Sequence, residues 1–485
     1  MKKLILLLTV MTVLFAQMPT SEYLYLDIHS NLTGKLPNGN PAYLESKNIP
    51  YSYAFQYNYF DQRGDYRRPF DPEAKHYNDI EVSAYREMDN GLLFAGRFAY
   101  RYEQRKNKLW LHNAETNINV PFYFADSTIG GFDLNGIDWN IIFSYPLSKV
   151  TRIAVDIFYN VDEQFKTVFP KPNVKRNDFH IRPAVTFSGG KTSAGLMVSY
   201  FKFRENIQTK KYSLEQGRSP IFMRIRGLDR SLLTYAETSE ERLQTITGYS
   251  FSGNIDLGDR LLAEMNHENA SAGIVDGGSY PVDQGNWDMN RWYYRIDLRS
   301  MATRYMDINI FFKQHWDKAR GYHPDLNALI YQYGYRNFRG GVNVPYSSLA
   351  GETWTSTIAY GFEDIHREDN LLGLAHYIPW TTFKVGIDYQ LIRKGIEYSF
   401  DLNYNNIKIG ETLEYNDMAD WYYDTITVNE IAYYATDREE IEGGLKIAFP
   451  FRGRRAAISG TYKEVRPINN DTRFHETNVS VELQF

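Results

Sequence analysis

Cysteine is absent from the 485 residues, and this absence removes several kinds of chemistry at once. The chain can form no disulfide, no cysteine-ligated zinc or iron–sulfur site, no thiol nucleophile and no lipid-modified cysteine. Net charge is small as well. Because 54 Lys and Arg residues face 59 Asp and Glu residues, the charge of −5 gives no electrostatic reason to expect nucleic-acid binding. With 43% hydrophobic and 16% aromatic residues, the composition is too apolar for a disordered chain.

Long apolar runs are missing apart from one at the start of the chain. Lys2 and Lys3 precede an apolar stretch over 4–15, and Ala16 followed by Gln17 offers a cleavage point. A basic region, an apolar region and a small residue in this order are typical of a secretory signal peptide. The alternative, a helical membrane anchor, needs roughly 17 to 25 apolar residues. We therefore predict that residues 1–16 are a signal peptide and that the chain is exported.

Alternation of apolar and polar residues with a period of two dominates the rest of the chain. In the run 92–103, one face carries Leu92, Phe94 and Phe98. The other face carries Arg97 and Arg101. Such alternation indicates β-strands with one apolar face and one polar face. It recurs in the runs 79–87, 139–145, 152–160, 178–187, 194–200, 291–299, 382–391, 396–404, 441–449 and 476–485.

Strands of this kind can bury their apolar face in two architectures. A soluble β-sandwich or propeller packs that face into a protein core, whereas a membrane β-barrel turns it to lipid and encloses the polar face. Here the polar faces carry many charges of both signs, which suits a hydrated interior. Tyr and Trp recur near the strand ends, as the aromatic girdles of a membrane barrel require. Both features favour the barrel.

The lengths of the connections favour the barrel too. Tight turns are expected at Asp89-Asn90-Gly91, Gly189-Gly190, Gly258-Asp259 and Lys394-Gly395. Long polar connections are expected at 205–242, 268–289 and 405–437. Short turns on one side and long loops on the other are typical of outer-membrane barrels. We predict an all-β fold over 50–485, a transmembrane antiparallel up-and-down β-barrel of about 18 strands in a range of about 16 to 20.

The last strand supports a resemblance to a known class of proteins. It ends in Val479, Val481, Leu483 and Phe485, and so resembles the C-terminal signature of Gram-negative outer-membrane β-barrel proteins. The resemblance implies that the barrel-assembly machinery reads Val481, Leu483 and Phe485 as an assembly signal. It also implies a place in the outer membrane, in contact with lipid and lipopolysaccharide. The cleavage region and the Tyr-rich strands are similar to outer-membrane proteins of the Bacteroidota.

The segment 17–49 is too short for a separate plug domain. A TonB-dependent transporter resembles this chain in its expected location, but it needs a large folded plug domain before the barrel. Here roughly 30 residues separate Gln17 from the first strand near Pro50, so energised transport by this chain alone is not expected. The segment 17–49 is either a periplasmic tail or a small lumen plug. We favour the tail.

Charged side chains on the polar faces are expected to line the lumen. Their signs balance, which argues against a strongly selective ring of one charge. Two interpretations remain open, namely a hydrated and weakly selective conduit, or a salt-bridge network that closes the lumen. The predicted lining residues are Arg97, Arg101, Arg152, Asp156, Arg182, Arg291, Arg295, Asp297, Arg299, Lys384, Asp388, Glu397, Asp401, Glu442 and Lys446. Of these, the arginines at 291, 295 and 299 form a ladder that could guide anionic solutes or pair with Asp307 and its neighbours.

Catalytic and metal chemistry have weak support in the sequence. Ser199 and His180 lie on inward faces of adjacent expected strands, where an acyl-hydrolase barrel would place its nucleophile and base. However, the inward faces of a membrane barrel are polar in general, so many barrels would offer a Ser and His pair by chance. His315 and His323 with Asp317 between them could form a loop metal site, but a surface loop is the simpler interpretation. We predict no enzyme activity, no metal and no cofactor.

Three functions are compatible with these features. The first is a porin-like passive conduit for small hydrophilic solutes, which we favour. The second is a closed-lumen barrel that serves as a structural or partner subunit of an outer-membrane uptake or secretion assembly, beside another outer-membrane protein. The third is an outer-membrane enzyme. The aromatic group at Tyr415 and Trp421–Asp424 suits sugar stacking or protein contact, although we assign it to the outer aromatic girdle.

Overall fold

A computed structural model places most of the chain. It describes residues 39–44, 51–113, 120–210, 221–228, 231–235, 240–258, 260–278, 280–301, 303, 305–326, 328–348, 352–415, 423–451, 454–468 and 470–484. The predicted signal peptide, most of the segment 17–49, Trp421 and Phe485 lie outside the described residues. In the described part of the chain, no helix is both long and apolar enough to cross a membrane.

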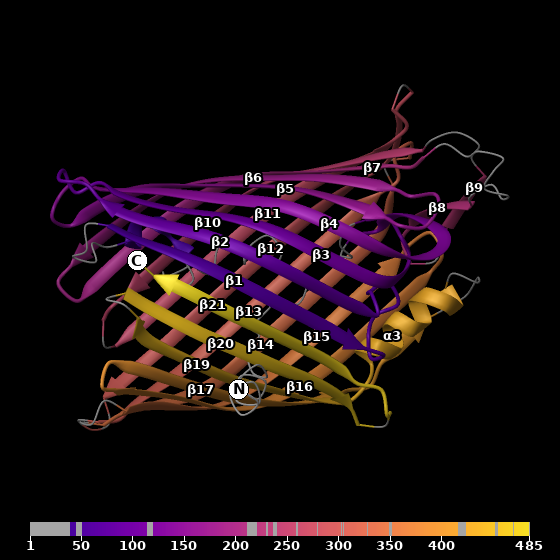
Figure 1. Cartoon of the computed structure of the whole chain (residues 1–485). Coiled ribbons are helices and arrows are strands. Elements are labelled where there is room, and N and C mark those ends of the chain that lie inside the picture. The colour runs from indigo at the N-terminus through magenta and orange to yellow at the C-terminus, as the bar shows by residue number, and fades with distance from the viewer. Residues whose placement is uncertain are drawn as a thin grey trace, which may run out of the picture.

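The strands form a closed antiparallel barrel (Figure 1). Of the 21 strands in the sheet, β8, β9 and β18 lie outside the ring, which leaves eighteen in it. The ring closes because β1 pairs with β2 on one side and with β21 on the other. The eighteen are β1 (Tyr51–Gly64), β2 (Ala74–Glu87), β3 (Leu93–Leu111), β4 (Phe122–Pro146), β5 (Thr151–Lys166), β6 (Asn173–Gly189), β7 (Thr192–Gln208), β10 (Glu241–Asp256), β11 (Leu261–Asp276), β12 (Val282–Met301), β13 (Asp307–Tyr322), β14 (Leu329–Ser347), β15 (Glu352–Asp369), β16 (Leu374–Arg393), β17 (Ile396–Ile409), β19 (Arg438–Phe451), β20 (Arg454–Pro467) and β21 (Phe474–Gln484). The predicted fold and strand number are confirmed.

The ends of the barrel differ as the connection lengths predict. Every tight turn of the sequence analysis lies at the end where β1 begins, which we call the turn end. At one of them, Lys394 and Gly395 have φ values of 53° and 77°, which suit the turn of a two-residue hairpin. The opposite end, the mouth, holds the long connections 209–240 and 410–437. The prediction of a long loop at 268–289 is wrong, because β11 and β12 occupy most of this range and only residues 277–281 connect them.

The apolar side chains of the wall strands lie on the outer face of the barrel. Along β16, Phe383, Val385 and Ile387 point outward, and Ile387 keeps 44% of its surface exposed. Thr382, which points inward, keeps only 4%. Exposed apolar side chains of this size, repeated around the ring, would be costly in water and are suited to acyl chains.

Position along the outer face should decide how well an added charge is tolerated. Val198 lies midway along β7 with half of its surface exposed, whereas Gln208 ends the same strand on the same face. We expect Val198→Arg to lower the free energy of unfolding by about 2–4 kcal/mol, because a charge at the bilayer midplane is poorly solvated. Gln208→Arg, near the interface, should cost about 1 kcal/mol or less. Urea titration in lipid vesicles measures both, and equal losses would contradict the assigned outer face.

Short elements occupy the mouth and the lumen in addition to the wall strands. They are η3 (Pro41–Tyr43), β8 (Ile221–Arg226), β9 (Ser231–Tyr235), β18 (Leu413–Tyr415), the π-helical turn η5 (Tyr423–Thr427) and α3 (Val428–Tyr434). The last two follow one another and form a short helical segment at the mouth (Figure 1). The alternation analysis expected no helix there. A run this short carries too few turns to show a 3.6-residue period.

Candidate functional site: a loop plug in the barrel mouth

Described residues of four connections meet inside the mouth, and together we call these connections the loop plug. They are 65–73, 112–121, 209–240 and 410–437, and the start of β4 is continuous with the second. β8, within the third, pairs with the first residues of β4 from Phe122↔Arg226 to Asp126↔Phe222. β4 pairs with its wall neighbour β5 only from Phe132 onward. A two-stranded ribbon therefore branches from the wall into the plug.

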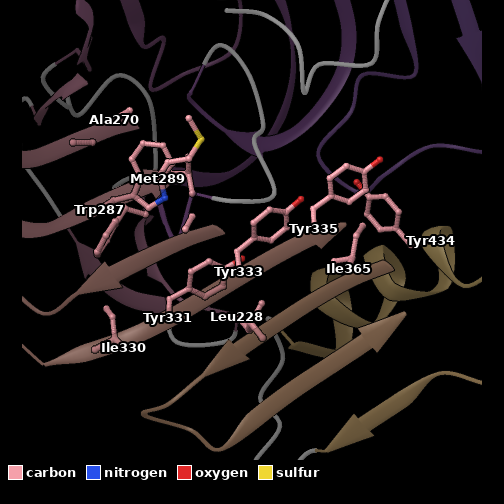
Figure 2. Close-up of a cluster of buried hydrophobic side chains, with 14 of the residues drawn as sticks. Leu228, Ala270, Trp287, Met289, Ile330, Tyr331, Tyr333, Tyr335, Ile365 and Tyr434 are labelled. Atoms are coloured by element: carbon pink, nitrogen blue, oxygen red, sulfur yellow. The ribbon is translucent and has the colours of Figure 1, made fainter. Parts of the chain in front are cut away.

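A buried aromatic cluster joins the loop plug to the inner wall. Tyr331, Tyr333 and Tyr335 follow one another along the inner face of β14, and Tyr434 reaches the same cluster from α3 (Figure 2). The side chain of Tyr331 keeps only 1% of its surface exposed. The remaining members come from the plug and from β7 and β10–β17, and are Val120, Phe122, Phe201, Leu228, Ile246, Ala270, Ala272, Ile274, Trp287, Met289, Ala319, Ile330, Ile365, Leu374, Ile378, Trp380, Ile407 and Tyr423. The mouth is thus packed like a protein core.

The sequence of the wall strands explains why the cluster forms at the mouth. Inward positions of β14 are Tyr331, Tyr333 and Tyr335 near the mouth, and Arg339 further along. Near the mouth the same strand turns polar residues such as Arg336 outward. The apolar face of β14 therefore points inward near the mouth and outward further along the strand. Such a change provides an inward apolar surface that the loops can cover.

Polar contacts fix the plug to the wall at the end of β15. The Arg367 guanidinium donates to Oε2 of Glu430 in α3 at 2.6 Å. The backbone N–H of Leu228 donates to Oδ2 of Asp369 at 3.0 Å, and Thr427 Oγ1 donates to the carbonyl oxygen of Leu228. The third and fourth connections are therefore bound to each other and to one wall strand. Because Arg367 is 3% exposed, its partner is held in a poorly hydrated site.

The first connection joins the same assembly through a tyrosine. The Tyr66 hydroxyl donates to the carbonyl oxygen of Tyr433 at 2.7 Å, and the two rings stack with centroids 4.7 Å apart. Burial raises the pKa of Tyr66 to about 12, so the hydroxyl keeps its proton and remains a donor at neutral pH. A cavity of about 20 Å³ lies between the plug and the wall beside Arg68 and Arg367. That volume suits about one water molecule, so the plug fits the wall closely.

One aromatic residue of the last long loop, Tyr423, lies inside and not in a girdle. Tyr423 is 1% exposed, donates its hydroxyl proton to Glu414, and lies 3.2 Å from Nε2 of His376. For Tyr423 the girdle assignment is therefore wrong. The sequence alone did not distinguish a girdle position from a buried position, because an aromatic residue beside acids suits both a membrane interface and a buried hydrogen-bonded site.

A second inner contact lies near the turn end, where residues 39–44 meet the wall. Ala42 packs against Ala184 and Met197, and its carbonyl oxygen accepts from Thr186 Oγ1 at 3.1 Å. The Asn254 side chain donates to the Tyr43 hydroxyl at 2.6 Å. These wall residues all lie on inward faces. The part of the segment 17–49 that the structure describes thus lies in the lumen.

Gly195 makes room for this segment. A Cβ atom at Gly195 would lie 2.5 Å from Oδ1 of Asn254 and 2.7 Å from both Nδ2 of Asn40 and Cε2 of Tyr43. We expect Gly195→Val to displace residues 39–44 and to speed proteolytic cleavage there several-fold, because the contacts leave no space for the added atoms. Gly189→Val serves as the control, since nothing lies within 4 Å of a Cβ there. Mass spectrometry of timed digests measures the rates, and equal rates in both variants would contradict the docking.

Most of the predicted lumen arginines are neutralised by carboxylates. Arg182 pairs with Asp156 at 2.6 Å, and both side chains are buried. Arg97 pairs with Glu81 at 2.8 Å and with Asp138. The half of the lumen bounded by β2–β6 therefore holds a network of ion pairs.

The expected arginine ladder on β12 is paired as well, but not with Asp307. Arg291 contacts Asp317 at 3.0 Å and Glu268 at 3.5 Å. Further toward the turn end, the Arg295 guanidinium contacts Asp297 at 2.6 Å. Arg299 is 3.5 Å from Asp256 and donates to the carbonyl oxygen of Gly258 at 2.8 Å. Each arginine of the ladder has a partner within its own strand, on β10, β11 or β13, or in the β10–β11 turn. No row of free positive charge therefore remains on β12.

The other predicted lumen residues are less tightly held. Glu397 pairs with Arg455, Arg152 donates to Ser144 Oγ at 3.4 Å, and Arg101 lies 5.4 Å from the centroid of the Tyr77 ring. Within the part of the chain that the structure describes, no ion pair within 4.0 Å is formed by Lys384, Asp388, Asp401, Glu442 or Lys446. Asp388 is exposed although it points inward, and it lies directly opposite Asp401 in the ladder. These inward charges, on a wall that is formed by β16, β17 and β19, therefore lack a close ion pair among the described residues.

The strand expected to carry the assembly signal closes the ring. Val481 lies opposite Tyr57 and Leu483 opposite Phe55 on β1, so the last strand joins the first. Phe485 lies outside the described residues. Whether assembly machinery reads these residues stays a prediction.

The candidate catalytic and metal residues occupy structural positions. His180 lies 3.0 Å from Asp178 and stacks on Phe201 with ring centroids 5.5 Å apart. His315 Nε2 contacts Asp317 at 2.7 Å on β13, whereas His323 lies beyond the end of that strand. Among the described residues, no group of three or more His, Asp or Glu side chains is arranged to hold a metal ion.

Comparison with family models gives one match. Residues 41–485 match a family of unknown function (DUF6850). The chain belongs to this family. The DUF6850 match runs from η3 to the end of the chain, so it includes the lumen contact, the loop plug and the whole barrel. No curated protein matches this sequence.

Several solved structures, including those of a transporter and a receptor, align with most of this chain. The FrpB iron transporter from Neisseria meningitidis is 8% identical with a TM-score of 0.45, and the match covers 90% of this chain and 81% of that one. The ferric yersiniabactin uptake receptor FyuA from Yersinia pestis is 8% identical with a TM-score of 0.43, covering 91% and 80%. A Pseudomonas aeruginosa FadL homologue is 9% identical with a TM-score of 0.33, covering 89% of each chain. At such low identity and TM-score, the likeness says nothing about what this chain binds or carries.

Proposed function

We propose that this chain is a gated outer-membrane barrel of a Gram-negative bacterium, whose mouth is sealed at rest by its own loops. A small hydrophilic solute would pass when the loop plug moves. The observation that carries the proposal is the aromatic cluster, in which loop residues and inward wall residues are buried together. An open porin would keep water-exposed polar groups in that position.

The wall around Lys384 and Asp388 supports a conduit below the plug. Its side chains point inward, are partly or fully exposed and form no close ion pair among the described residues. Their mixed signs favour small polar or zwitterionic solutes over ions of one charge. Residues 39–44 narrow the opposite half of the lumen and would leave this wall as the path. In this account the segment 17–49 acts as a small lumen plug.

A permanently closed barrel is the second candidate. The close fit of the loop plug and the ion pair of buried Arg367 support it, because a gate that must move often would need weaker contacts. Such a barrel would serve as a partner subunit beside another outer-membrane protein. In both versions the outer face contacts lipid and lipopolysaccharide, assembly uses the barrel-assembly machinery, and no enzyme activity is expected.

Conductance in planar lipid bilayers tests the resting state. For the wild-type chain we expect a silent baseline with rare, brief openings, because the buried aromatic cluster fills part of the mouth. A disulfide between Leu228→Cys and Thr427→Cys would lock two plug segments, and the native chain has no cysteine to interfere. Loss of the rare openings on oxidation supports the gate, and their absence in every state supports the closed subunit. Steady ohmic steps in the wild type would contradict both.

A further inference from the structure

Three arginines converge at the mouth, and we call them the arginine cluster. Arg224 and Arg226 lie two residues apart on β8 and so share one face of the ribbon. Arg242 lies at the start of β10 on the adjacent wall. Asp276, at the end of β11, lies between ribbon and wall. The cluster lies at the mouth and is separate from the lumen charges described above.

Among the described residues, two carboxylates form close contacts with the three guanidiniums of the cluster. Asp276 accepts from Nε of Arg242 at 2.6 Å and from Nε of Arg224 at 2.5 Å, so two guanidiniums share one carboxylate. Glu240 contacts only Arg224, at 2.6 Å. Arg226 is held by neutral groups, since it donates to Oε1 of Gln284 at 2.7 Å and lies 3.5 Å from Nε2 of His323.

Two N–H groups of the cluster point to a missing acceptor. Among the described residues, Nε of Arg226 and Nη1 of Arg242 are buried and meet no hydrogen-bond acceptor. The side chain of Arg242 is only 2% exposed. Burial, and next the positive charge of Arg242, lower the pKa of Arg226, although the charges of Asp276 and Asp325 act to raise it.

We propose that the arginine cluster binds a phosphate group at the barrel mouth, with Arg226 and Arg242 as its donors. A guanidinium presents a planar set of N–H donors that matches two phosphate oxygens at once. A phosphate here would supply the absent negative charge and accept from both unpartnered N–H groups. Arg226 is partly exposed, which gives the group a route of entry. Free phosphate and a phosphate of lipopolysaccharide offer the same chemistry.

The test uses the purified full-length chain in detergent micelles with two probes. The first is inorganic phosphate, titrated by calorimetry. The second is fluorescent lipopolysaccharide, with and without its phosphates, measured by anisotropy. Arg226→Gln keeps a polar side chain and leaves the Arg224 and Arg242 contacts with Asp276 intact. Arg320→Gln, at an exposed position on the outer face of β13, is the matched control. Retained heat-modifiable migration on gels confirms that each variant is folded.

Saturable phosphate binding that weakens about tenfold or more in Arg226→Gln, but not in Arg320→Gln, supports the proposal with a free ligand. Binding of phosphorylated but not dephosphorylated lipopolysaccharide, with the same dependence on Arg226, supports it with a lipid ligand. Failure to bind either probe, or equal effects of the two substitutions, overturns it. None of these results depends on whether the lumen conducts, so they test phosphate binding separately from the gating proposal.

Discussion

Glu430→Arg should convert a silent barrel into a conducting one. The substitution replaces the acid that Arg367 binds and places a third guanidinium beside Arg68 and Arg367 at the cavity under the plug. Removing the partner of a buried charge costs about 3–5 kcal/mol, and repulsion between like charges adds to that cost. We expect the helical segment to leave the wall, and planar-bilayer recordings to show frequent, long-lived openings in place of rare ones.

Two further variants make this result specific. Asp424→Arg changes charge by the same amount on an exposed residue of the same helical segment, and should leave the baseline silent. The double variant Arg367→Glu with Glu430→Arg restores opposite charges in reversed order and should close the barrel again. Continued silence of Glu430→Arg in a correctly folded barrel would favour the closed subunit over the gate.

Among single substitutions that replace a lumen arginine with methionine, we expect Arg182→Met to cause the largest loss of stability. Asp156, its partner at 2.6 Å, has 0% of its surface exposed and would be left as an uncompensated buried charge. We expect a loss of about 3–5 kcal/mol in the free energy of unfolding, measured by urea titration in lipid vesicles. By contrast, Arg455→Met breaks a half-exposed pair with Glu397 and should cost about 1 kcal/mol or less.

A double-mutant cycle separates the ion pair from packing. Asp156→Leu combined with Arg182→Met removes both charges and replaces them with apolar groups of similar volume, which is often close to neutral in a buried site. The combined loss should therefore be smaller than the loss from Arg182→Met alone. If the double variant is instead the least stable of the set, the charges do not act as a pair, and the network described for this half of the lumen is wrong.

The wall of the barrel could be predicted because its strands and tight turns depend on residues that are close together in the sequence. Alternation with a period of two places Arg97 and Phe98 on opposite faces whatever the rest of the chain does. Turns such as Lys394-Gly395 are set by the backbone preferences of two residues. The arginine ladder shows the limit of the method. Its inward direction followed from spacing, but its partners Asp317 and Asp256 depend on strand register, which the spacing within one strand does not determine.

The loop plug could not be predicted by the same means. The pairing of Phe122 with Arg226 joins residues about a hundred positions apart in two connections that have no alternating pattern. One signal was nevertheless present in the wall. On β14, the tyrosines at 331, 333 and 335 alternate with Gln332 and Arg336 in a phase opposite to that of the lipid belt further along. A change of phase within one strand predicts an inner apolar surface, and such a surface requires something to cover it.

The central claim is that the outward stripe of each strand contacts acyl chains while the inward stripe faces the lumen. Because the chain has no cysteine, single cysteines can be placed one at a time from Thr382 to Asp388 of β16 and spin-labelled in lipid vesicles. Molecular oxygen concentrates among acyl chains, so its collision rate with each label reports lipid contact. We predict high rates at Phe383, Val385 and Ile387 and low rates at the positions between them. Uniformly low rates, or maxima at the alternate positions, would contradict the account.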